Sequence, residues 1–191
     1  MTNANASAVR TRTLVECGML IAVATVLGYI PIYSLPMGGS ITLCATAPLV
    51  ILSYRQGWKW GLFAATVHGV IQLMLGFSNV MYCPTLLTMI GCALLDYILA
   101  YAVVGLSSKF TFGIEKNTVA VIAGTLATGL LRYLCSFVSG VLIWGGYAPE
   151  GMPVWQYSLL YNGSFMLPEI ILTTIAVAAI MQMLNGKKTE K

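Results

Sequence analysis

Six long apolar stretches, joined by short polar or Gly/Pro-rich connections, set the pattern of this sequence. They span residues 13–30, 40–54, 58–75, 85–106, 118–144 and 154–184. A helix needs about 20 consecutive apolar residues to cross the hydrocarbon core of a bilayer. The second stretch is shorter and contains Thr42 and Pro48, so we expect it to be broken or tilted. The pattern predicts an all-α membrane protein of six transmembrane helices, which forms a single integral-membrane domain over residues 1–191.

The composition supports this assignment to the lipid bilayer. Of the 191 residues, 58% are hydrophobic and 8% are charged, whereas a soluble domain carries about a quarter charged residues. The net charge of +4 comes from basic residues scattered between the apolar stretches. Because they form no patch, we expect no nucleic-acid partner. The five cysteines form no CxxC pair, so we interpret them as small core residues and predict no metal site.

The positions of lysine and arginine orient the predicted spans. Outside the spans, or at their ends, lie Arg10, Arg12, Arg55, Lys59, Lys109, Lys116, Lys187, Lys188 and Lys191. These residues occupy the two termini and every second connection, whereas the connections 31–39, 76–84 and 145–153 contain neither lysine nor arginine. Basic residues favour the cytoplasmic side, so we expect both termini in the cytoplasm. We find no repeat of inverted topology, which argues against a transporter complete within one chain.

Four ionisable residues fall within the predicted spans, namely Glu16, Asp96, Arg132 and Glu169. Each costs on the order of 2.5–3.5 kcal/mol at a helix centre and must face protein or water. Glu16 lies near the cytoplasmic end of its span, where water can solvate it. Asp96 and Arg132 lie mid-span, and two interpretations remain open. They form a structural ion pair between helices, or they belong to a binding site for a polar or cationic ligand.

Uncharged polar residues near the same level favour the binding site. Ser136 follows Arg132 by one helical turn and shares its face. Asn162 and Glu169, seven residues apart, share a face of the last span. Trp144 ends the span that carries Arg132, where its ring can stack on an aromatic or cationic ligand. We therefore predict a polar cavity between these two spans with Trp144 at its mouth.

No catalytic constellation is present, so we expect no enzymatic activity. The sequence has no HExxH and no GxxxxGK[ST] phosphate loop. Its single histidine, His68, lies one turn before Gln72, and we interpret both as hydrogen-bond partners between helices. We expect no bound cofactor. If transport uses ATP, another subunit must hydrolyse it.

The first span carries small residues at helical spacing. Gly18 and Ala22 are four residues apart, and so are Ala24 and Gly28. Such spacing lets another helix approach closely. The approaching helix belongs either to a partner subunit, which would dock on Gly18 and Ala22, or to this chain itself.

Several segments resemble a known transporter family. They are the SG-x-x-x-W run that ends at Trp144, the YAPEGMPVWQYSL loop over 147–159, Tyr157 followed five residues later by Asn162, LLDY at 94–97, and VECGMLIAVA at 15–24. These segments resemble the thiamine-specific substrate-binding component (S component) of energy-coupling factor (ECF) transporters, a class of ABC transporter. Weaker similarity extends through all six spans.

The resemblance implies a fold, a ligand and partners. It implies a six-helix protein of the bacterial plasma membrane with an outward binding pocket for thiamine or a close relative. It also implies a transmembrane coupling subunit, docked on Gly18 and Ala22, and two ATPase subunits. The substrate contacts that it implies fall on Asp96, Tyr97, Trp144, Tyr157 and Asn162, with a basic residue at Arg132 and Ser136 one turn further.

Thiamine carries a fixed positive charge, and this suggests roles for the residues. Asp96 supplies the anion and Trp144 supplies an aromatic face for the cation. Arg132 is expected deeper, balancing Asp96 or Glu169. Ser136 stands where some relatives have histidine, so other ligands remain open, either a thiamine-related pyrimidine or another small vitamin. A further alternative is a stand-alone membrane channel or assembly protein whose polar residues are structural.

Overall fold

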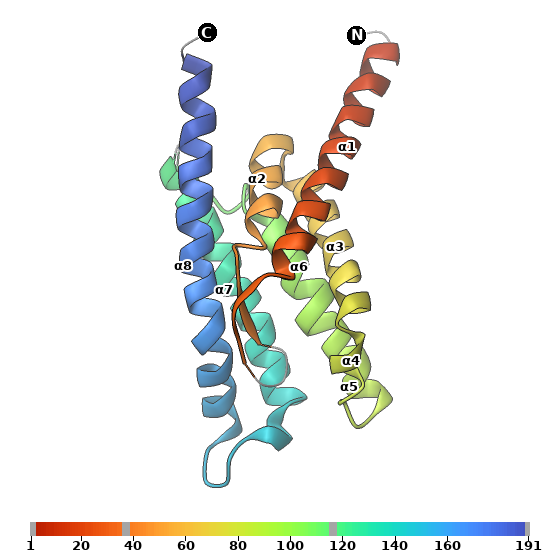
Figure 1. The fold of residues 1–191 in the computed structure, drawn as a ribbon, viewed down its shortest axis with the longest axis vertical. Coiled ribbons are helices and arrows are strands. Elements are labelled where there is room, and N and C mark those ends of the chain that lie inside the picture. The colour runs from red at the N-terminus through yellow and green to blue at the C-terminus, as the bar shows by residue number, and fades with distance from the viewer. Residues whose placement is uncertain (1–2, 36–38, 115–117, 190–191) are drawn as a thin grey trace.

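The fold was analysed in a computed structural model, which describes residues 3–35, 39–114 and 118–189. Pro36, Lys116 and Lys191, which entered the sequence-based predictions, lie outside the described residues. The elements in chain order are α1 (Asn3–Gly28), β1 (Pro31–Ser34), β2 (Ser40–Thr42), α2 (Ala47–Gln56), α3 (Trp58–Leu75), α4 (Phe77–Val80), α5 (Leu86–Cys92), the π-helix η2 (Ala93–Leu99), α6 (Ala100–Ala102), the 3₁₀ helix η3 (Val103–Leu106), α7 (Thr118–Leu142), the 3₁₀ helix η4 (Gly145–Tyr147) and α8 (Val154–Thr189). Figure 1 shows these helices as an elongated bundle.

The long apolar stretches form helices, as the sequence predicts. Within the described residues, four helical segments are long and apolar enough to cross a membrane: Ser7–Gly28, Leu86–Leu106, Thr118–Leu142 and Val154–Leu184. The expected third span coincides with α3, which has 18 residues. The fold is therefore predominantly helical and suited to a bilayer.

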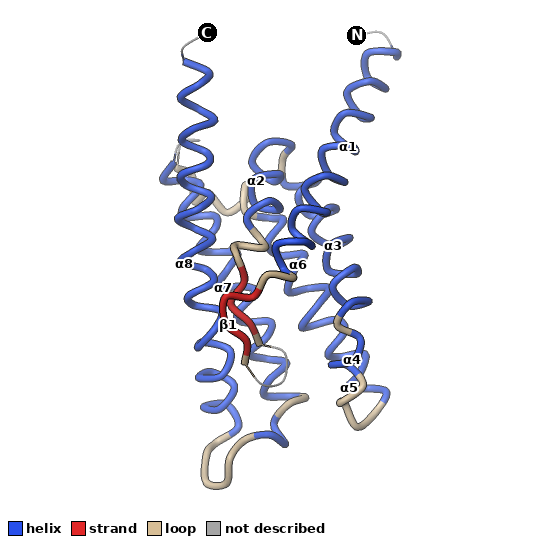
Figure 2. The backbone as a smooth tube through the Cα atoms, in the orientation of Figure 1, coloured by secondary structure: helices blue, strands red, loops and turns tan. Residues whose placement is uncertain are grey.

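The stretch 40–54 differs from the single helix expected there. Its first residues form β2, which pairs antiparallel with β1 so that Pro31 lies opposite Thr42 and Ser34 opposite Ser40 (Figure 2). Only from Ala47 does the chain become helical, and α2 has just 10 residues. Pro48 lies in the first helical turn, where a missing backbone N–H breaks no helical hydrogen bond. The proline thus permits the helix to begin here, after the hairpin.

The short helix α2 lies at the centre of the core. All its residues from Ala47 to Ser53 are buried. Leu49 and Leu52 pack in one cluster with Cys17 and Ala24 of α1 and with small residues of α3. A helix that is apolar on every side must be surrounded by protein or lipid. Here α1 and α3 pack against α2 and cover part of its surface.

The segment between Leu86 and Leu106 contains a local change of helical geometry. It is α-helical to Cys92, becomes a π-helix over Ala93–Leu99, and returns to α-helix at Ala100. Asp96 lies in the π-helical part. The wider turn re-aims the side chains that it carries, and such segments are frequent at functional sites.

The two termini lie at the same end of the molecule in Figure 1. The connections from α2 to α3 and from η3 to α7 lie toward that end as well, whereas the connections from α4 to α5 and from α7 to α8 lie at the opposite end. The described basic residues Arg55, Lys59 and Lys109 therefore belong to the end that carries the termini. The opposite end carries the Gly/Pro-rich loop before α8.

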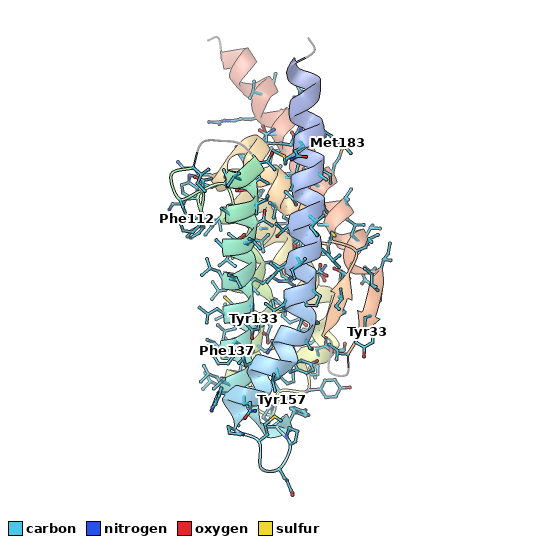
Figure 3. All side chains as sticks on the ribbon, turned by 90° about the vertical axis from the view of Figure 1, so that its left-hand side faces the viewer. Tyr33, Phe112, Tyr133, Phe137, Tyr157 and Met183 are labelled. Carbon is cyan, nitrogen blue, oxygen red and sulfur yellow. The ribbon has the colours of Figure 1, made fainter. Side chains whose placement is uncertain are left out.

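Helices α7 and α8 pack against each other along much of their length (Figure 3). A Cβ atom at Gly140 would collide with the side chain of Ser158, so the glycine permits the close approach of the two helices. Tyr33, on the hairpin, points away from the bundle in Figure 3 and is exposed. The hairpin itself packs through β2 against α8.

Candidate functional site

A cavity of about 260 Å³ lies between the hairpin, the π-helix, α7 and α8. All seven binding residues expected from the sequence line it: Asp96, Tyr97, Arg132, Ser136, Trp144, Tyr157 and Asn162. They come from the π-helix, from α7 and the turn that follows it, and from α8. The structure therefore brings every one of them to a single cavity.

Asp96 is held by two side chains of the α7 segment. The Ser139 hydroxyl donates to Asp96 Oδ2 at 2.6 Å, and the Trp144 indole N–H donates to the same oxygen at 3.1 Å. The other oxygen, Oδ1, receives no N–H or O–H hydrogen bond from the described residues. Asp96 is thus fixed in position mainly through Oδ2, with the Cys92 side chain as a further hydrogen-bond partner of the carboxylate, and Oδ1 can still accept from a ligand.

Trp144 contributes to the cavity in two ways. Its indole N–H orients Asp96, and its ring lies among the cavity residues. Tyr147 packs at 5.8 Å from the Trp144 ring, between the ring centroids. Trp155, in contrast, is more than half exposed, as expected of a residue at the lipid interface.

Asn162 and Ser136 link α7 to α8 beside the cavity. The Asn162 side-chain amide donates to the Ser136 carbonyl at 3.3 Å and to the Ser158 carbonyl at 3.0 Å. Asn162 is only 8% exposed, and these bonds fix the direction of its side chain. On the other wall, the Tyr97 hydroxyl donates to the Gly76 carbonyl at 3.2 Å.

An aromatic row on α8 completes one wall, and the sequence analysis identified only its first member. Tyr157 stacks on Tyr161 with ring centroids 5.7 Å apart, and Tyr161 packs edge-on against Phe165 at the same distance. All three residues line the cavity. Their i, i+4, i+8 spacing places them on one helical face, and this spacing after Tyr157 was the signal that could have identified the other two.

The β-hairpin also contributes to the cavity, which the sequence analysis did not foresee. Glu169 accepts two hydrogen bonds from Thr42, one from the backbone N–H at 2.7 Å and one from the hydroxyl at 2.6 Å. The backbone N–H of Gly39 donates to the Tyr161 hydroxyl at 3.3 Å. These bonds fasten the hairpin to α8, so that Gly39, Ser40 and Thr42 become part of the cavity lining.

Arg132 does not pair with either carboxylate, contrary to the role expected for it. Within the described residues the only ion pair joins Arg55 to Glu16. The Arg132 guanidinium lies instead 4.6 Å from the ring centroid of Tyr101. The reason is that Asp96 and Glu169 are already engaged by neutral donors. The structural Asp96–Arg132 ion pair, the alternative left open by the sequence, is not formed.

His68 forms the contact between helices that the sequence predicts, whereas the hydrogen-bond partner of Gln72 is His68 on the same helix, α3. His68 is fully buried, and its ring contacts the Thr25 hydroxyl of α1 and the Gln72 amide, each at 3.3 Å. On α1, Ala24 is buried and Gly28 lines the cavity, whereas Gly18 and Ala22 are exposed. The two small-residue pairs of α1 therefore face different surroundings, and only Gly18 and Ala22 remain open to another helix.

Comparison with known proteins identifies relatives of this chain. A family model described as "Thiamine transporter protein" matches residues 14–189. Thiamine transporter ThiT of Bacillus subtilis is 32% identical over 178 residues, which cover 87% of this chain and 88% of the relative. Thiamine transporter ThiT of Lacticaseibacillus paracasei is 29% identical, with coverage of 88% and 86%.

A solved structure shares the fold. The structure of ThiT from Listeria monocytogenes aligns with a TM-score of 0.75 at 25% sequence identity, covering 91% of this chain and 95% of that chain. The family consists of transporters and not of enzymes. These matches confirm the resemblance found in the sequence, and the chain belongs to the thiamine transporter family.

Proposed function

We propose that this chain binds thiamine in the cavity and serves thiamine uptake as the S component of an ECF transporter. The observation that carries the proposal is the contact between Asp96 and Trp144 in the wall of one cavity. A carboxylate beside an aromatic face suits a flat organic cation. The family membership of the chain supports the same ligand.

The remaining lining residues fit the other half of thiamine. Its aminopyrimidine ring needs neutral donors and acceptors as well as a flat surface. The Tyr97 hydroxyl, which donates to the Gly76 carbonyl, can accept from the ring, and so can the side-chain oxygen of Asn162, whose amide group donates to Ser136 and Ser158. The Tyr157 hydroxyl adds a further polar group. The ring of Tyr157, stacked on Tyr161, offers the surface. Ser136 supplies a smaller polar group where some relatives have histidine.

A titration of the isolated chain tests the proposal. Thiamine should quench tryptophan fluorescence, because Trp144 contacts the ligand, and it should do so without any ATPase present. The pyrimidine half and another small vitamin serve as comparison ligands. If none of them binds while the purified protein is folded, the polar residues are structural, and a channel or assembly function becomes the better explanation.

We also propose that the chain crosses the membrane six times with both termini in the cytoplasm. The hairpin with α2 would provide the second crossing and α3 the third. The common end of the termini in Figure 1 and the basic residues near that end support this topology. Gly146 has open space around it, so Gly146→Cys should react with a membrane-impermeant thiol reagent on intact cells, measured against the unsubstituted chain. Labelling only after permeabilisation would reverse the topology.

Uptake then requires partners in the bacterial plasma membrane. We propose that a transmembrane coupling subunit docks on Gly18 and Ala22, that two ATPase subunits hydrolyse ATP, and that this chain needs no cofactor. Leucine at either position should abolish uptake and leave thiamine binding intact. Val23→Phe, at an exposed position on another face of α1, is the control. If binding is lost together with uptake, the two residues pack within the chain.

A further inference from the structure

The cavity contains a cation that no described carboxylate neutralises. The Arg132 Nε atom is buried and has no hydrogen-bond partner among the described residues. Arg132 also forms no ion pair with any described carboxylate. Its contact with the Tyr101 ring contributes about 0.5–2 kcal/mol, which is less than the cost of an arginine at the centre of a membrane helix. Water in the cavity or a bound acceptor must therefore stabilise this charge.

Both carboxylates of the cavity are engaged elsewhere. Asp96 accepts from Ser139 and Trp144 through Oδ2. Glu169 uses both of its oxygens for Thr42. The acids that would normally neutralise an arginine therefore accept from neutral donors and form no ion pair with Arg132, which lines the cavity.

A second, smaller cavity of about 20 Å³ adjoins Arg132 on its other side. It is lined by Arg132 and Glu169, by Thr125 and Thr128 of α7 and Thr173 of α8, and by apolar residues. Thr46 lines both cavities and contacts the Thr173 hydroxyl at 3.4 Å. Arg132 thus lines both cavities. Because the Thr125 and Thr128 hydroxyls already donate to backbone carbonyls of α7, an acceptor bound near this point depends on the guanidinium.

From this geometry we propose that Arg132 forms an anion subsite of the cavity, which takes a phosphate-type oxyanion. The subsite deepens the proposed function and rests on it, because the oxyanion would be bound in the same cavity as the thiazolium cation. A guanidinium presents a planar pair of N–H groups that matches two oxygens of a phosphate. The oxyanion is either the phosphate ester of a thiamine phosphate or a free anion bound beside thiamine.

Titrations of Arg132 variants distinguish the two sources of the oxyanion. Arg132→Gln should weaken binding of thiamine monophosphate by about 10- to 100-fold more than binding of thiamine, since hydrogen bonds to a charged group contribute about 1.5–3 kcal/mol. Arg132→Lys should give an intermediate loss, because it keeps the charge without the planar pair. If the anion is free, phosphate at constant ionic strength should instead raise thiamine affinity, and Arg132→Gln should abolish that effect.

A second measurement does not depend on thiamine. Inorganic phosphate alone should raise the Tm of the purified protein, and Arg132→Gln should remove this shift. Arg55→Gln is the matched control, because it removes an arginine whose side chain is 42% exposed and which pairs with Glu16 outside the cavity. The control should keep both the phosphate response and the selectivity between the two ligands.

The outcomes separate the subsite from the proposed function. Equal losses for thiamine and its monophosphate in Arg132→Gln, with no phosphate effect on affinity or Tm, would show that Arg132 is structural and would overturn the subsite. In that case thiamine binding by the wild-type chain still stands. If the wild-type chain binds phosphate but neither thiamine compound, the subsite stands and the proposed function fails.

Discussion

The cavity has two carboxylates, Asp96, which is half-buried, and Glu169, which is buried, and they are held in different ways. Asp96, on the π-helix, accepts both of its O–H and N–H hydrogen bonds on one oxygen, from side chains of the α7 segment. Glu169, on α8, accepts one hydrogen bond from Thr42 of the hairpin on each of its two oxygens. One carboxylate therefore has an oxygen that accepts no N–H or O–H hydrogen bond, whereas the other has both oxygens engaged in joining two parts of the fold.

This difference separates charge recognition from structural support. A carboxylate with an oxygen that accepts no N–H or O–H hydrogen bond can contact the cationic ring of a ligand directly. A carboxylate that accepts a backbone N–H and a hydroxyl is stabilised by those donors and contributes mainly to the position of the hairpin. We therefore assign ligand charge recognition to Asp96 and closure of the cavity to Glu169.

The largest effect is expected from Asp96→Asn. The side chain keeps its shape and can still accept from Ser139 and Trp144, but it loses the charge opposite the thiazolium ring. Loss of one partner from a buried charge pair costs about 2–5 kcal/mol, so thiamine affinity should fall by at least about 30-fold. The neutral pyrimidine half should lose much less. Titration of both ligands on folded protein gives the comparison, and equal losses would mean that Asp96 serves structure only.

The second-largest loss of affinity is expected when Trp144 is replaced. Trp144→Ala removes the aromatic face and one donor to Asp96, so it should weaken both thiamine and its pyrimidine half, with a loss of about 2 kcal/mol for the cation. Trp144→Phe keeps a ring and removes only the indole N–H, so its loss should be near 1 kcal/mol. The affinities can be measured by calorimetry, which needs no tryptophan signal. If Trp144→Ala binds thiamine and the pyrimidine half as tightly as the wild-type chain does, the ligand does not stack on this ring.

The sequence predicts the helical parts of this arrangement well. Long apolar stretches identify α1, α3, α7 and α8, and isolated polar residues within them identify the cavity wall. Asp96 and Asn162 could be found because a polar group in lipid needs a structural or functional reason. Family resemblance added Tyr97, which the hydrophobic pattern alone does not distinguish.

The parts that the sequence does not predict depend on distant contacts. The hairpin residues Ile41 and Leu43 are as apolar as a membrane helix, so hydropathy assigns them to a span. The hydrogen bonds between Thr42 and Glu169 join positions 127 residues apart, so no local sequence pattern predicts them. The expected pairing of Arg132 with a carboxylate failed for the same reason, because the competing donors to those carboxylates come from other elements.

The smallest effect on affinity is expected at the hairpin, and it completes the comparison of the two carboxylates. Thr42→Val keeps the shape and the backbone N–H but removes the hydroxyl that Glu169 accepts from, a loss of about 1 kcal/mol. The hairpin should then open more readily, and thiamine should dissociate about fivefold faster in stopped-flow fluorescence.

Glu169→Gln can keep both contacts with Thr42, through its carbonyl and its amide, so it should change the rate of thiamine dissociation less than Thr42→Val does. Its effect should also be equal for thiamine and the pyrimidine half, because the charge of Glu169 is not used for the ligand. A loss confined to thiamine and as large as that of Asp96→Asn would instead show that both carboxylates recognise the cation.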